Sequence, residues 1–199
     1  MAARLFNKGS VACLLVLLLL VVDQIIKIEV KTNMFLHESV RVTDWFYIYF
    51  IENEGMAFGM KFGGAVGKFL LSFFRIGLFA ALCWWISTLV KKSTVPTGVI
   101  VGLTLITAGA FGNIIDSLFY GLIFGYAPFM FGRVVDMFFF PIIDTTWPAW
   151  MPFVGGNHFL FFAPVFNFAD SCVTVGALYL IFFQYKFFAR GDEPEEESK

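Results

Sequence analysis

The sequence predicts an all-α integral membrane protein with four transmembrane helices, and two observations support this fold class. Of the 199 residues, 59% are hydrophobic and only 15% are charged, and the mean hydropathy is +0.79. The apolar residues also occur in runs long enough to cross a hydrocarbon layer of about 30 Å. A soluble domain has neither this composition nor runs of this length.

Each transmembrane helix is predicted from one continuous apolar run. The four runs are Ser10–Ile26, Phe69–Val90, Val95–Ile115 and Phe166–Phe188. Basic residues at the ends of these runs gather on one side of the membrane: Arg4, Lys8, Lys91, Lys92, Lys186 and Arg190. Because basic residues favour the cytoplasmic side, we expect both termini to be cytoplasmic. Basic residues in the first loop weaken this asymmetry but do not reverse it.

The first run could instead be a cleavable signal sequence, because a short basic start precedes it. No small-residue cleavage site follows Val22, however, and the helical pattern continues from Asp23 to Lys27. We therefore expect this run to be a retained helix.

Two loops join the predicted helices. The first contains Trp45–Ile51, an aromatic, β-prone run that is predicted to be a strand at the membrane surface. The second, Leu118–Pro164, is rich in Phe, Trp, Pro and Gly, and aromatic residues of this kind favour the headgroup level. Its beginning, Leu118–Gly132, could form a fifth span, but this segment is short and contains Pro128. We expect it to lie at the interface.

The chain is predicted to form a single membrane domain over residues 1–190. The glutamate-rich residues 191–199 are expected to be a disordered cytoplasmic tail. Cysteines occur at positions 13, 83 and 172, all within predicted helices, and their spacing fits neither a disulfide framework nor a zinc site.

Charge and composition also exclude several kinds of partner. A net charge of −1 and the lack of a Gly-rich phosphate loop argue against nucleic acid. With only His37 and His158, and no pair of histidines at helical spacing around a glutamate, no catalytic metal is expected. No other cofactor is predicted.

Four aspartates in or beside the apolar runs indicate where chemistry could take place: Asp23, Asp116, Asp136 and Asp170. An ionisable side chain in a bilayer costs about 2.5–3.5 kcal/mol on insertion scales, and it persists mainly where it is paired or lines a wet cavity. Helical rise places Asp170 about 24 Å above Lys186 and Asp23 about 22 Å above Lys8. All four carboxylates are therefore predicted near the outer leaflet.

Each aspartate has a structural and a chemical interpretation. Asp23 and Lys27 have the i, i+4 spacing of a helical ion pair, and Asp116 could brace the end of the third helix. Asp136, expected in a loop, and Asp170 are the least explained by local pairing. We therefore assign these two to chemistry.

Two carboxylates a few ångströms apart do not both ionise easily, so one retains a proton. The ionised member can take a proton from water, and the protonated member can hydrogen-bond the scissile carbonyl, as in aspartic proteases. A small transporter or channel is the alternative class, and it would distribute its acids along a pathway through the membrane. An intramembrane protease of the presenilin type would share the pair of aspartates but normally has more spans.

Five segments of the sequence together resemble the bacterial lipoprotein signal peptidases, the type II signal peptidases. They are Asp23–Lys27, Asn53–Gly59 (Asn-Glu-Gly-Met-Ala-Phe-Gly), Gly109–Asp116, Val134–Asp136 and Phe166–Ser171. Any one segment is weak evidence, but the five occur in the family's order and span nearly the whole chain.

The resemblance implies an aspartic endopeptidase with Asp136 and Asp170 as its catalytic pair. Its substrates would be prolipoproteins with a diacylglyceryl-modified cysteine, cut just before that cysteine. We further expect a monomer in the lipid of the bacterial inner membrane, with the site near the outer leaflet. By family analogy Asn53, Gly55, Asn113 and Asn167 line the site, and Asp23, Lys27 and Asp116 stabilise its surroundings. A non-catalytic binder of lipoprotein precursors remains an alternative.

The chain departs from the family pattern at two points. Ser117 occupies a position where the family usually has Arg, and Arg133 or Arg75 could take over that role. The segments on either side of Asp136 are also longer than usual. On the family pattern, the strand at Trp45–Ile51 would belong to a small extracytoplasmic sheet, and the second loop could act as a periplasmic lid.

Overall fold

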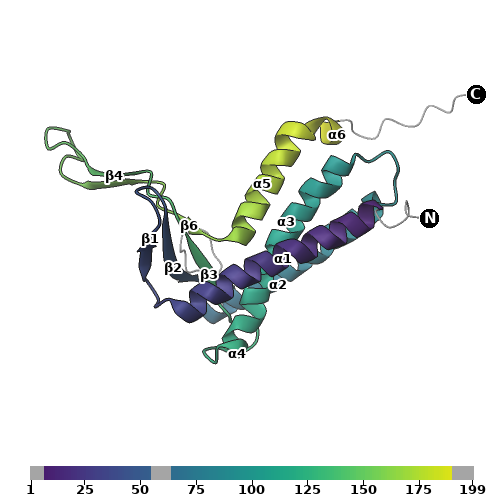
Figure 1. Cartoon of the computed structure of the whole chain (residues 1–199), viewed down its shortest axis with the longest axis horizontal. Coiled ribbons are helices and arrows are strands. Elements are labelled where there is room, and N and C mark those ends of the chain that lie inside the picture. Colours follow the sequence, from purple (N-terminus) through teal and green to yellow (C-terminus); the bar gives the residue numbers. More distant parts are fainter. Residues whose placement is uncertain (1–6, 55–63, 190–199) are drawn as a thin grey trace, which may run out of the picture. The chain divides into compact units, whose positions relative to one another are not determined.

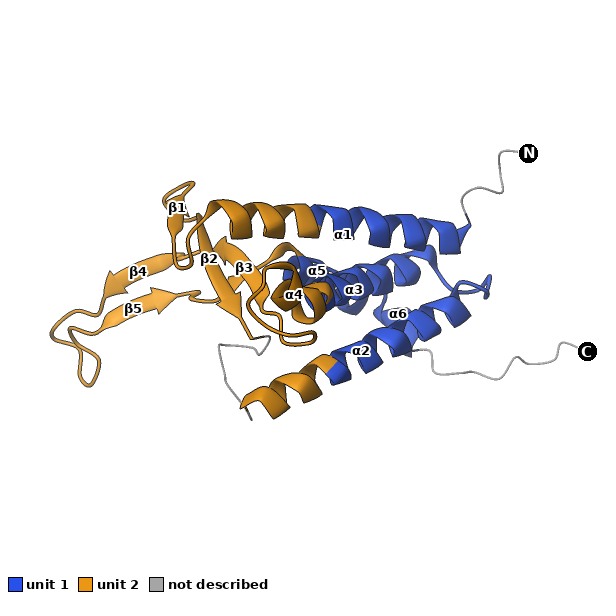
Figure 2. Cartoon of the chain, turned by 90° about the horizontal axis from the view of Figure 1, so that it is seen from below, with its two compact units in different colours: residues 1–22, 73–114, 169–199 blue, residues 23–72, 115–168 orange. Residues whose placement is uncertain are grey.

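The computed structural model describes residues 7–54 and 64–189, which form mostly helices and a small sheet (Figure 1). The chain divides into two compact units, residues 1–22, 73–114 and 169–199 in the first and residues 23–72 and 115–168 in the second (Figure 2). The helical elements are α1 (Lys8–Asn33), α2 (Gly64–Leu89), α3 (Thr97–Ile115), the π-helix η3 (Asp116–Tyr120), α4 (Gly121–Ile123), α5 (Phe168–Phe183) and α6 (Tyr185–Ala189). The strands are β1 (Ser39–Arg41), β2 (Tyr47–Asn53), β3 (Val134–Phe139), β4 (Ile143–Thr146), β5 (His158–Phe161) and β6 (Val165–Phe166).

Apolar helices occur at all four predicted positions. Within the described residues, α1, α2 and the continuous helix Thr97–Ile123 are long and apolar enough to cross a membrane, and α5 is a shorter apolar helix of 16 residues. The last predicted span is divided in two, because α5 ends at Phe183 and α6 follows from Tyr185.

Two predicted helix ends were wrong. Helix α1 continues to Asn33 rather than ending at Ile26, because Lys27 and Lys31, which interrupt the apolar run, both pair with carboxylates. The third predicted helix ended at Ile115, but the helix that begins at Thr97 continues through η3 and α4 to Ile123. Apolar run length alone underestimates a helix whose charged residues are paired inside the protein.

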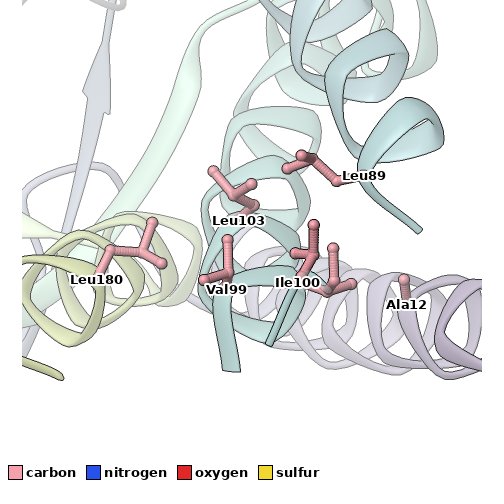
Figure 3. Packing of buried hydrophobic residues seen from close by; sticks show 7 residues of the cluster. Ala12, Leu89, Val99, Ile100, Leu103 and Leu180 are labelled. Atoms are coloured by element: carbon pink, nitrogen blue, oxygen red, sulfur yellow. The ribbon is translucent and has the colours of Figure 1, made fainter. Parts of the chain in front are cut away.

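The first unit is held together by an apolar cluster around α3. Side chains from α1, α2 and α5 surround this helix (Figure 3), and the cluster comprises Ala12, Leu89, Val95, Val99, Ile100, Leu103 and Leu180. Glycines permit close approach of α3 and α5, since a Cβ atom at Gly109 would lie 2.2 Å from the carbonyl oxygen of Ala169. Small residues at such contacts are typical of helix packing in membranes.

The second unit contains a four-stranded sheet with the strand order β1-β2-β3-β6, in which all the pairs are antiparallel. The strand predicted at Trp45–Ile51 is confirmed as β2, which begins at Tyr47 and extends to Asn53. The loop expected around Asp136 was wrong, because this residue lies in β3 and pairs with Ile51. One face of the sheet packs into a core formed by Val30, Phe50, Tyr120, Val135 and Met137.

A β-bulge interrupts the pairing of β2 with β3. Ile48 lies opposite Phe138, but the next pair is Ile51 with Asp136, so three steps along β2 match two along β3. A bulge of this kind changes which side chains of a strand share a face with those of its neighbour.

A two-stranded hairpin, β4–β5, forms within the aromatic second loop. His158 Nε2 and Asp144 Oδ1 lie 2.5 Å apart between its two strands, and the ring centroids of Trp147 and Phe159 are 4.7 Å apart. The connection between the strands exposes large apolar side chains, with Trp150 80% and Phe153 103% accessible. The aromatic side chains of Trp150 and Phe153 are therefore exposed and not covered by the strands of the hairpin.

Candidate active site

A buried lysine with two carboxylates lies in the second unit. Lys27 Nζ is 3.0 Å from Asp23 Oδ2 and 2.8 Å from Asp116 Oδ2, and the three side chains are between 0% and 3% exposed. The ion pair predicted from the i, i+4 spacing of Asp23 and Lys27 is thus present. Asp116 joins it from the end of the third helix, consistent with its predicted bracing role.

Two further side chains complete this cluster, and the sequence analysis did not identify them. Gln24 Nε2 donates to Asp116 Oδ1 at 3.0 Å and to Asp23 Oδ2 at 3.1 Å, while the Tyr120 hydroxyl donates to Gln24 Oε1 at 3.1 Å. The backbone N–H of Val135 donates to Asp116 Oδ2 at 3.3 Å and so ties the cluster to β3. Neither side chain has a local sequence signal, because its partners lie up to 96 residues away.

The π-helix η3 begins at Asp116 and ends at Tyr120, and both residues contact Gln24. Short π-helical turns within α-helices are frequent at functional sites. The wider turn here coincides with the segment that carries the buried acid.

Asp136 is oriented by two asparagine amides. Asn53 Nδ2, at the end of β2, donates to Asp136 Oδ2 at 3.2 Å, and Asn167 Nδ2, directly after β6, donates to Oδ1 at 2.6 Å. Asp136 is only 2% exposed and Asn167 is fully buried. The sheet therefore brings together three residues that are far apart in the sequence, and each carboxylate oxygen has a neutral donor.

Asp170 lies in the first turn of α5 and has an amide donor of the same kind. Asn113 Nδ2, on α3, donates to Asp170 Oδ1 at 2.8 Å within the first unit. Asn167, which donates to Asp136, precedes Asp170 by three residues in the sequence.

Arg133 contacts an acid that is not among the predicted site residues. Its Nη1 atom donates to Glu52 Oε2 at 3.0 Å, and Lys31 pairs with Glu52 Oε1. Burial raises the pKa of the Glu52 carboxyl, but the hydrogen bonds from Lys31 and Arg133 outweigh it and the pKa lies below the ordinary value. Glu52 is thus held ionised between two cations.

Ser117 takes no part in the contacts described above. Ser117 is buried, and its carbonyl oxygen accepts the backbone N–H of Gly132 at 2.9 Å. Gly55 lies outside the described residues. Across residues 7–54 and 64–189, no group of three or more His, Cys, Asp or Glu side chains is placed to hold a metal ion.

Sequence comparison relates the chain to one family of known proteins. Residues 15–186 match the sequence profile of the family Signal peptidase (SPase) II. A lipoprotein signal peptidase of Porphyromonas gingivalis is 47% identical over 189 residues, covering 87% of this chain and 82% of the relative. One of Amoebophilus asiaticus is 34% identical over 174 residues, covering 83% and 73%.

Solved structures agree on the fold. One bacterial membrane enzyme determined by the in meso method superposes with a TM-score of 0.63 at 24% identity, covering 93% of each chain. A second has a TM-score of 0.58 at 25% identity, covering 86% of this chain and 90% of its own. The family profile matches most of the chain, and relatives are 47% and 34% identical to it over most of their length. The chain therefore belongs to the signal peptidase II family.

Proposed function

We propose that this chain is a membrane aspartic endopeptidase that removes the signal peptide from diacylglyceryl-modified prolipoproteins by cutting just before the lipidated cysteine. Membership of the signal peptidase II family supports the peptidase activity, and the relatives are named lipoprotein signal peptidases.

Asp136 and Asp170 are proposed as the catalytic pair. The observation that carries this assignment is that each carboxylate is oriented by asparagine amides, Asp136 by Asn53 and Asn167 and Asp170 by Asn113. An amide N–H donor fixes the direction of a carboxylate and does not itself titrate.

The reaction follows from one ionised and one protonated carboxyl group. Two amide donors favour the negative form of Asp136, so we assign it as the base that takes a proton from water. The water oxygen attacks the scissile carbonyl carbon while protonated Asp170 donates to the carbonyl oxygen. Asp136 then gives the proton it took to the amide nitrogen as the C–N bond breaks, and Asp170 regains its proton from the diol oxygen. The products are the signal peptide with a new carboxyl group and the lipoprotein with a free amine on the lipidated cysteine.

The other predicted site residues are proposed to support this pair. Lys27 and its two acids anchor η3 and, through the Val135 N–H, the strand that carries Asp136. Asn53, Asn113 and Asn167 position the two carboxylates, and Gly55 is proposed to line the site although it lies outside the described residues. Arg133 is proposed to act indirectly, through its hydrogen bond to Glu52.

The placement in the cell follows the sequence. We propose a monomer in the bacterial inner membrane, with both termini cytoplasmic and the site near the outer leaflet. The β4–β5 hairpin is proposed to act as a periplasmic lid that contacts lipid. Its uncharged connection, residues 147–157, contains two Trp residues, which favour the headgroup level of a bilayer.

Cleavage of a purified diacylglyceryl-modified prolipoprotein tests the proposal. Wild-type protein should cut before the lipidated cysteine, and Asp136→Asn and Asp170→Asn should each lower kcat by about 10²- to 10⁴-fold. Asp44→Asn is the matched control, because this aspartate is exposed and pairs with Arg41. Wild-type rates in both site variants would overturn the dyad, and binding of precursor without any cleavage would favour a non-catalytic binder.

A further inference from the structure

A cluster of charged and aromatic side chains lies next to the candidate base and takes no part in the proposed proton transfers. Both carboxylate oxygens of Glu52 are occupied, Oε1 by Lys31 and Oε2 by Arg133. The Lys31 and Glu52 side chains are 9% and 10% exposed, whereas that of Arg133 is 45% exposed. This is a largely buried ion-pair network at the junction of a helix and two strands.

Aromatic rings hold the two cations in place. Lys31 Nζ lies 4.8 Å from the ring centroid of Tyr126, 4.9 Å from that of Phe124 and 5.7 Å from that of Phe50. The Tyr126 hydroxyl accepts the backbone N–H of Arg133 at 2.7 Å, and the guanidinium lies 5.6 Å from the same ring. Cation–π contacts of this kind favour one position of the charge. Arg133 is fixed through both its backbone and its side chain directly before β3.

Strand geometry relates this network to the candidate base. Beyond the bulge, Glu52 lies opposite Val135 and Asn53 opposite Val134. Because side chains alternate between the two faces of a strand, Asn53 shares a face with Asp136, and Glu52 lies on the other face. With an unbulged ladder continuing from Ile48 and Phe138, β2 would be displaced by one residue and Glu52 would lie on the face of Asp136.

We propose that Glu52 is a positioning residue for the peptidase reaction: held between Lys31 and Arg133, it fixes the strand register in which Asn53 donates to Asp136. This inference rests on the proposed role of Asp136. A buried ion pair contributes little net stability compared with apolar residues of the same size, and specification of register is its best-attested use. The lowered pKa of Glu52 keeps the network charged at neutral pH.

Glu52→Gln tests the proposal, because it retains the shape of the side chain and removes its charge. We expect kcat to fall about 10- to 100-fold, the scale of a misplaced catalytic group, with KM within about twofold of wild type. The acid limb of the kcat profile should also move to higher pH, since a weaker amide contact no longer favours ionised Asp136. Lower yield of folded enzyme would scale this profile without moving it.

A double-mutant cycle with Asn53→Ala makes the test specific. If Glu52 acts through Asn53, the double variant should be no slower than Asn53→Ala alone. Asp44→Asn is the matched control, because it makes the same change in an exposed pair and should leave kcat and its pH profile unaltered. Unfolding midpoints of all variants, measured together, separate misfolding from misplacement.

The outcomes distinguish this inference from the proposed function. If Asp136→Asn is inactive but Glu52→Gln keeps the wild-type kcat and pH profile, only the positioning role is overturned. Additive losses in the cycle also overturn it. If Asp136→Asn is fully active, the proposed function fails first, whatever Glu52 does.

Discussion

Asn167 Nδ2 lies 2.6 Å from Asp136 Oδ1, and Asn167 is the residue directly before α5, whose first turn carries Asp170. The donor to one proposed catalytic carboxylate and the other carboxylate therefore belong to a single strand-to-helix connection. Any change in where α5 begins would alter the surroundings of both aspartates. This connection is short and contains no glycine, so it has few conformations to lose on folding.

Lys27→Met is expected to be strongly destabilising. The substitution leaves Asp23 and Asp116 buried next to each other without their shared cation, and breaking a buried ion pair costs about 3–5 kcal/mol. Thermal unfolding in detergent measures the effect, with the exposed Lys91→Met as the control. An unchanged unfolding midpoint would show that the two acids do not depend on the lysine.

Acid should selectively weaken the region around Glu52. Since the pKa of Glu52 is lowered in the folded state, its contribution to stability is complete above the ordinary glutamate pKa and is lost as the pH falls through the folded value. The unfolding midpoint of the wild type should therefore fall more steeply in acid than that of Glu52→Gln, and the two curves should converge. Parallel curves over the acidic range would contradict the assigned network.

The hairpin should matter in a bilayer and not in detergent. The double variant Trp150→Ser, Phe153→Ser removes the two most exposed aromatic side chains of the hairpin connection. We expect wild-type cleavage of detergent-solubilised precursor and several-fold slower cleavage in lipid vesicles, because interfacial aromatic residues stabilise contact with the headgroup region. Asp144→Asn, which changes an exposed polar pair between the strands of the same hairpin, is the control. Equal losses in detergent and vesicles would argue for direct contact with the substrate.

Glycine at position 109 should be required for packing of α3 on α5. A Cβ atom there would lie 2.2 Å from the carbonyl oxygen of Ala169, a backbone atom that cannot move without shifting α5. Gly109→Ala should lower the unfolding midpoint, whereas Gly77→Ala, where no atom lies within 4 Å, should raise it slightly through helix propensity of up to about 1 kcal/mol. A rise in both variants would mean that the two helices separate easily.

Local patterns in the sequence predicted the features that depend on nearby residues. The Asp23–Lys27 pair follows from helical spacing, and β2 follows from its aromatic, β-branched composition. The strand around Asp136 was missed because its partner strand lies more than eighty residues upstream. Sequence spacing carries no information about such a pairing.

Residues of the site were predicted unevenly for the same reason. Motifs identified Asn53, Asn113 and Asn167, and the structure adds which carboxylate each one contacts. The sequence analysis did not identify Gln24 and Glu52, although each is next to a motif residue. Their contacts with Asp116 and Arg133 join residues far apart in the sequence. A role for Glu52 could be predicted only from its contacts with Lys31 and Arg133, which the structure shows.

The bulge in β2 has a consequence for changes in chain length. Three residue steps from Ile48 to Ile51 match two steps on β3, so loss of one residue in this interval would leave Ile51 opposite Asp136 and Asn53 opposite Val134. Loss of one residue between Ile51 and Asn53 would instead move Asn53 from its position opposite Val134. A neighbouring side chain would then replace the Asn53 amide at the Asp136 carboxylate. Relatives that vary in length before the Asn motif are therefore expected to carry their insertions or deletions at or before Ile51 and to keep the spacing after it.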